Sequence, residues 1–128
     1  MLFENSQENI EGLIAKSADL TNKPFLHSVV KINGKYEMGE EDNDLTVNIL
    51  CRDKEGKRLE IYDLELELFQ SKNELVLVIS KLNFPNEPIF WCGSKTLWMD
   101  SNNGKKCVPP KYCSRLENLA NRIKSFID

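Results

Sequence analysis

The segment Leu45–Cys51 decides the fold class, and it reads Leu-Thr-Val-Asn-Ile-Leu-Cys. Apolar residues at positions 45, 47, 49 and 51 alternate with the polar residues Thr46, Asn48 and Arg52. A period of two residues is typical of a β-strand that buries one face and exposes the other to solvent. The sequence therefore predicts a half-buried antiparallel strand here.

The chain after this strand is expected to turn and return. Asp53–Gly56 has the composition of a turn, with a return strand expected from near Arg58. Apolar residues in the return strand occupy positions 59 and 61, and then 64, 66 and 68. A period-two pattern changes parity only where a residue is inserted, so we expect a β-bulge or a break near Tyr62-Asp63.

Further strands follow. Residues 71–73 predict another turn, and Glu74–Leu82 is almost continuously apolar, as is typical of a strand that is covered on both faces. We therefore expect this strand to be central in the sheet. Two short strands are expected on either side of Gly93.

Another strand is expected before Leu45. Phe25–Ile32 is rich in β-branched residues and predicts a strand. The dipeptide Asn33-Gly34 follows directly, and it favours the two-residue type I′ turn of a β-hairpin. The chain is thus expected to reverse at Asn33-Gly34, which would place Val29 opposite Met38.

Helical periodicity brackets these strands. One apolar stripe covers about residues 6–19, with Asn5 as the expected N-cap and Glu8 three residues later. A second stripe runs to residue 127 behind the capping-box pair Ser114 and Glu117. The pattern predicts an α+β fold: an antiparallel meander sheet of five to six strands bracketed by an N-terminal and a C-terminal amphipathic helix, in a single domain spanning residues 1–128.

Composition narrows the class of protein. The 128 residues are 41% hydrophobic and 29% charged, with a formal net charge of −3. No apolar run approaches the roughly 20 residues of a membrane span, and no signal peptide is visible. We expect a cytoplasmic protein that is not bound to a membrane. The interspersed charges disfavour nucleic acid as a partner.

No motif for catalysis or metal binding is evident. His27 is the only histidine, and we interpret it as an ordinary strand residue, with a catalytic role as the alternative. The four cysteines lack the closely spaced pairs of structural zinc sites, so reduced structural thiols are expected. The acidic segment Glu37–Asp44 lacks calcium-loop spacing and is interpreted as a solvated loop. We predict no catalytic residue, no metal and no cofactor.

The segment Phe90–Met99 contains both tryptophans of the chain. Core packing is the favoured interpretation of these rings, and a partner or ligand surface is the alternative. The residues singled out as a candidate interaction surface or pocket are Trp91, Cys92, Trp98, Tyr112 and His27.

Three classes of function remain. A small non-enzymatic binding or assembly module ranks first, because the structural pattern is well specified and reactive groups do not converge. A ligand-binding or enzymatic pocket between sheet and helix, near Trp91 and Trp98, ranks second. Binding of single-stranded nucleic acid ranks third, because of the acidic net charge. If both helices cover one face of the sheet, we expect the other face to be covered by an unknown protein partner, most simply by a second copy in a homodimer.

Overall fold

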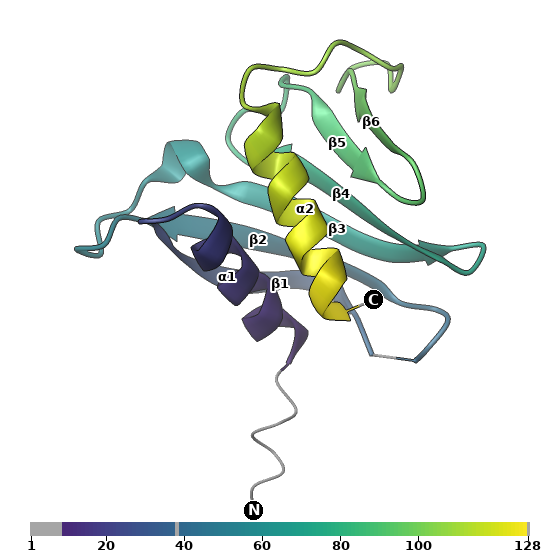
Figure 1. Ribbon diagram of the computed structural model, residues 1–128, viewed down its shortest axis with the longest axis horizontal. Coiled ribbons are helices and arrows are strands. Elements are labelled where there is room, and N and C mark those ends of the chain that lie inside the picture. The colour runs from purple at the N-terminus through teal and green to yellow at the C-terminus, as the bar shows by residue number, and fades with distance from the viewer. Residues whose placement is uncertain (1–8, 38, 128) are drawn as a thin grey trace, which may run out of the picture.

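The structure, a computed structural model, describes residues 9–37 and 39–127 (Figure 1). The elements of this part of the chain are α1 (Ile10–Thr21), β1 (Leu26–Lys35), β2 (Asp44–Arg52), the 3-10 helix η2 (Glu60–Tyr62), β3 (Leu64–Ser71), β4 (Glu74–Lys81), β5 (Ile89–Cys92), β6 (Thr96–Met99) and α2 (Cys113–Ile127). The six strands form one antiparallel sheet in the order β1-β2-β3-β4-β5-β6. The predicted α+β meander between two helices is therefore confirmed, with six strands.

The connection between β2 and β3 contains the expected break. After the turn at residues 53–56, Arg58 forms only an isolated bridge with Arg52. The helix η2 then interrupts the chain, and β3 begins at Leu64. This short helix lies where the apolar pattern changes from odd-numbered to even-numbered positions. The even-numbered residues of β3 therefore face the core beside the odd-numbered residues of β2. Leu66 accordingly pairs with Val47.

The hairpin predicted at Asn33-Gly34 is wrong. β1 continues through this dipeptide to Lys35, with Gly34 paired to Leu45, and a register shift between residues 31 and 33 marks a bulge. Val29 therefore lies opposite Ile49, and Met38 lies outside the described residues. Gly34 has a φ of +80°, but it adopts this conformation inside a strand, where a Cβ atom would clash with the carbonyl oxygen of Asp44.

The two-residue turn with positive φ lies instead between β3 and β4. Lys72 and Asn73 have φ values of 53° and 67°, and Ser71 pairs with Glu74 across the turn. These are the features of a type I′ hairpin. The turn predicted at residues 71–73 is confirmed.

Both helix starts differ from the expectation. Asn9 caps α1, because its Oδ1 accepts a hydrogen bond from the Gly12 amide at 2.7 Å. The expected cap, Asn5, and Glu8 lie outside the described residues. The predicted capping box of α2 does not form, because Ser114 already lies within the helix and the Glu117 carboxylate accepts a hydrogen bond from the Trp98 indole.

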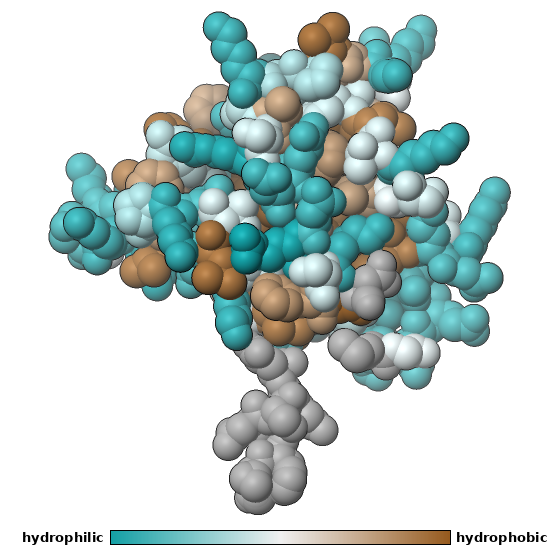
Figure 2. All heavy atoms as spheres, in the orientation of Figure 1, coloured by the Kyte–Doolittle hydropathy of each residue, from teal (hydrophilic) through white to brown (hydrophobic). Residues whose placement is uncertain are grey.

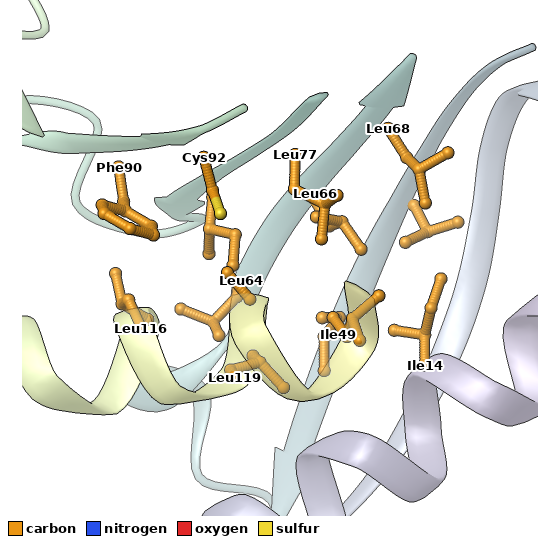
Figure 3. Close-up of a cluster of buried hydrophobic side chains, with 14 of the residues drawn as sticks. Ile14, Ile49, Leu64, Leu66, Leu68, Leu77, Phe90, Cys92, Leu116 and Leu119 are labelled. Carbon is orange, nitrogen blue, oxygen red and sulfur yellow. The ribbon is translucent and has the colours of Figure 1, made fainter. Parts of the chain in front are cut away.

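Both helices pack on the same face of the sheet (Figures 1 and 3). Ile14 of α1 and Leu119 of α2 meet Ile49 of β2 and Leu66 of β3 in one buried cluster (Figure 3). Polar side chains dominate the outer surface of this helical layer, and apolar residues there form small separate groups (Figure 2). Neither helix within the described part of the chain is long and apolar enough to span a membrane.

The opposite face of the sheet is partly covered by its own side chains. Val76 of β4 is fully buried there, as expected for a central strand with apolar residues on both faces. Phe69 and Trp91 make an edge-to-face contact with ring centroids 5.8 Å apart on the same face, where their strands pair with β4. Val30 of the edge strand β1 remains exposed there.

Candidate ligand-binding pocket

A cavity of about 100 Å³ lies between the sheet and the two helices. Its walls come from the α1–β1 connection, the ends of β1, β2 and β4, the region from η2 to the start of β3, and the first turn of α2 with the residue before it. The lining residues are Asn22, Phe25, His27, Cys51, Tyr62, Leu64, Lys81, Tyr112, Arg115 and Leu116.

The lining changes from apolar and buried to polar and exposed. Cys51, Leu64 and Leu116 are at most 5% exposed, whereas Lys81 is half-buried and Arg115 is exposed. The buried residues form the floor of the pocket because they occupy core-facing positions of β2, β3 and α2. The pocket thus offers an apolar floor and a positively charged rim.

His27 is held in place by Asp19 at the end of α1. Asp19 Oδ1 lies 3.0 Å from His27 Nδ1 and also accepts a hydrogen bond from the His27 backbone N–H at 2.7 Å. An ionised carboxylate only accepts hydrogen bonds, so Nδ1 carries the proton in this contact. His27 is 7% exposed and pairs with Cys51 across the β1–β2 ladder.

Cys51 lies beside an ion pair between the buried Asp63 and the exposed Arg58. Asp63, which is 2% exposed, accepts a hydrogen bond from the Cys51 amide at 2.8 Å and binds the Arg58 guanidinium through both carboxylate oxygens. Burial, and next the charge of Asp63, raise the pKa of the Cys51 thiol above its ordinary value. The thiol is therefore protonated at neutral pH, which makes it a poor nucleophile.

Two tyrosine rings hold the cations of the rim. Lys81 Nζ lies 3.9 Å from the centroid of the Tyr112 ring, and the Arg115 guanidinium lies 5.4 Å from that of Tyr62. The Tyr112 hydroxyl donates a hydrogen bond to Glu87 Oε1 at 3.0 Å. Burial, followed by this contact with Glu87, raises the pKa of Tyr112 well above its ordinary value, so its phenol stays neutral.

The structure separates the residues that the sequence grouped as a candidate site. His27 and Tyr112 line the pocket. Trp98 is 3% exposed and packs on Phe90 in the core, where Cys92 is also buried. Trp91 is half-buried on the opposite face of the sheet.

Sequence reasoning did not single out Lys81, Arg115 or Cys51 as site residues. A signal for Lys81 was present, because it continues the odd-numbered, core-facing phase of β4 beyond Ile79. A cation in a core-facing phase at the end of a strand indicates a partner or a pocket. No comparable local pattern distinguishes Arg115, which reaches the pocket only because the first turn of α2 packs there.

The surroundings of Cys51 argue against this thiol as a nucleophile. Asp19, His27 and Cys51 are residue types that form nucleophilic sites, but the thiol is buried and its pKa is raised. Within residues 9–37 and 39–127, no three His, Cys, Asp or Glu side chains gather closely enough to hold a metal ion. All four cysteines are free.

The fold and the pocket define a small α+β protein with a cavity between its sheet and its helical layer. The sequence matches the family described as a domain of unknown function (DUF8659) over residues 11–126, and the chain belongs to this family. Comparison with curated proteins and with solved structures found no match.

Proposed function

We propose that this protein is a small non-enzymatic binding module that takes up a small organic molecule in the cavity between the sheet and the helices. The observation that carries the proposal is the lining, which combines an apolar floor with a few polar groups held by other side chains. Ligand sites are typically concave and mainly apolar, with a small number of fixed polar groups.

An NMR titration tests this function. A panel of short alcohols, amides, amines and carboxylates is added to ¹⁵N-labelled protein, and we expect at least one compound to shift the amide signals of Cys51, Leu64 and Leu116. If no compound shifts them, the proposed function is wrong.

A matched pair of variants locates the binding. Leu116→Phe enlarges a side chain of the floor and should abolish the shifts, whereas Leu20→Phe enlarges an exposed residue of α1 and should leave them unchanged. The spectrum of each variant also reports whether it is folded. Shifts that persist in a folded Leu116→Phe variant would place the binding outside the cavity.

A second proposal concerns assembly into a homodimer through the sheet face that the helices leave uncovered. Leu26 and Val30 of β1 favour it, because they are 38% and 46% exposed on that face. Light scattering at micromolar concentration should give twice the mass of the chain. Val30→Glu should yield a monomer and Lys31→Glu should not, because Lys31 points to the other face. A monomeric wild-type protein would refute the homodimer.

A further inference from the structure

Lys81 and Arg115, the two cations of the pocket, form no ion pair with another described residue. The ion pairs among the described residues join Asp19 to His27, Glu37 to Lys35 and Asp63 to Arg58, and none includes Lys81 or Arg115. Two cationic side chains that line one small cavity repel each other unless an anion lies near both. An anion at this rim would therefore gain Coulomb attraction from both side chains.

Three acidic groups beside the pocket already have partners. Asp63 binds Arg58 and the Cys51 amide, Asp19 binds His27, and Glu87 accepts from the Tyr112 hydroxyl. Turning any of them toward the cations would break one of these hydrogen bonds, and for Asp63 would leave a buried amide without its acceptor. A small anion from solution can meet Lys81 and Arg115 without that loss.

The tyrosine rings also hold the two cationic side chains in place beside the cavity, where a ligand would bind. Stacking of Lys81 on Tyr112 and of Arg115 on Tyr62 restricts both long side chains beside the cavity. Less side-chain entropy is then lost when an anion binds. A guanidinium also offers paired N–H donors that match a carboxylate or a phosphate.

The size of the cavity limits the rest of the ligand. Its volume of about 100 Å³ is below the roughly 150 Å³ of an engineered cavity that binds benzene. A chain of a few carbon atoms fits this space. The floor of Cys51, Leu64 and Leu116 presents apolar surface to such a chain.

We propose that the pocket binds a short-chain organic anion, with its carbon chain on the apolar floor and its anionic group at Lys81 and Arg115. This inference rests on the proposed binding function and adds the charge and the size of the ligand. A carboxylate and a phosphate ester share the chemistry that the two cations recognise.

The test compares three probes of different charge and polarity by NMR titration. Butyrate has the proposed charge and chain, butyramide is its neutral counterpart, and inorganic phosphate is an anion without a chain. We expect butyrate to bind at least about tenfold more tightly than butyramide, because hydrogen bonds to an ionised group are about twice as strong as those between neutral groups. We expect phosphate alone to shift the floor amides of Leu64 and Leu116 less than butyrate does.

Charge-removing variants assign the effect to the rim. Lys81→Met and Arg115→Met keep most of the side-chain length, and each should weaken butyrate binding at least about fivefold while leaving butyramide unchanged. Lys95→Met removes an exposed lysine that does not line the cavity and should change neither.

The outcomes separate this inference from the proposed function. If butyrate and butyramide bind with equal affinity, the ligand is not an anion, but the proposed binding function stands. The same conclusion follows if butyrate does not bind while another compound of the panel shifts the floor amides. If phosphate and butyrate shift the floor amides equally, the proposal that the ligand has a carbon chain is wrong. Failure of every compound to shift the floor amides would overturn both proposals.

Discussion

The carboxylate of Asp19 holds His27 at two points, through the ring nitrogen Nδ1 at 3.0 Å and through the backbone N–H at 2.7 Å. Asp19 lies on α1 and His27 lies on the edge strand β1, so one oxygen atom ties the first helix to the edge of the sheet. The same contact fixes the orientation of a residue that lines the pocket.

Replacement of Asp19 by alanine should remove both hydrogen bonds and lower the free energy of unfolding by about 1–2 kcal/mol. Asp19→Asn keeps an acceptor oxygen and should therefore lower the free energy of unfolding by a smaller amount. Urea denaturation measures both values. An Asp19→Ala variant as stable as the wild type would show that water replaces the carboxylate without loss.

The indole of Trp98 is buried, and its Nε1 donates a hydrogen bond to Glu117 Oε2 at 2.8 Å. Glu117→Ala leaves this donor without its partner and should cost about 1–3 kcal/mol of stability. Glu117→Gln retains an acceptor and serves as the control, with a smaller loss expected. The indole N–H signal in the NMR spectrum should move strongly in the alanine variant. An unmoved signal would contradict the contact.

The buried carboxylate of Asp63 binds Arg58 and the Cys51 amide. Asp63→Ala should destabilise the fold by about 1–3 kcal/mol, because the buried Cys51 amide loses its acceptor. Asp42→Ala removes an exposed carboxylate from a loop and should change stability little. Similar unfolding midpoints for the two variants would refute a structural role for Asp63.

Partial burial, followed by the charges of Asp44 and Glu65, raises the pKa of Glu67 above its ordinary value. The folded state therefore binds this proton more strongly than the unfolded state, and stability falls as the pH rises from the unfolded pKa through the folded pKa. Glu67→Gln should raise stability at pH 7, by less than about 1 kcal/mol for this exposed side chain. The gain should vanish near pH 3, below both pKa values.

Thermal unfolding of Glu67→Gln at the two pH values measures this difference. Glu55→Gln, in an exposed turn, is the control and should behave like the wild type at both. An equal gain from Glu67→Gln at pH 3 and pH 7 would exclude ionisation as its cause.

Burial raises the pKa of the Cys51 and Cys92 thiols, whereas Cys107 and Cys113 are only half-buried. A thiol reagent at pH 8 should therefore modify Cys107 and Cys113 rapidly in the native protein, and the other two only after unfolding. Mass spectrometry of the labelled peptides identifies the sites. Equally rapid labelling of Cys51 would show that the pocket floor opens readily.

The sequence predicted the elements of the fold well, because strand alternation and helical stripes are local signals. The parity change before Leu64 located a break that η2 occupies. The prediction failed at Asn33-Gly34, where local turn preference competes with pairing to Thr46 and Leu45 and the longer ladder prevails. Ser114 failed as a cap for a similar reason, since the Trp98 indole engages the Glu117 carboxylate.

The candidate site was less accessible to sequence reasoning. His27 and Tyr112 are in the pocket, but their neighbours Cys51, Lys81 and Arg115 come from segments that meet only through tertiary packing. The two tryptophans drew attention by their residue type, yet they lie on opposite faces of the sheet. Periodicity identifies the face on which a residue lies, but it does not identify the residues of other elements that share a cavity with it.

Every strand of the meander pairs with the next strand along the chain, so each hairpin closes a short loop at a small entropic cost. The packing of α1 on α2 is different, because it joins segments about 100 residues apart in the sequence. Contacts of short sequence separation form fastest, so we expect the sheet to assemble before α2 docks on it. The first turn of α2 supplies Arg115 and Leu116 to the pocket, so we expect the cavity to be completed late in folding.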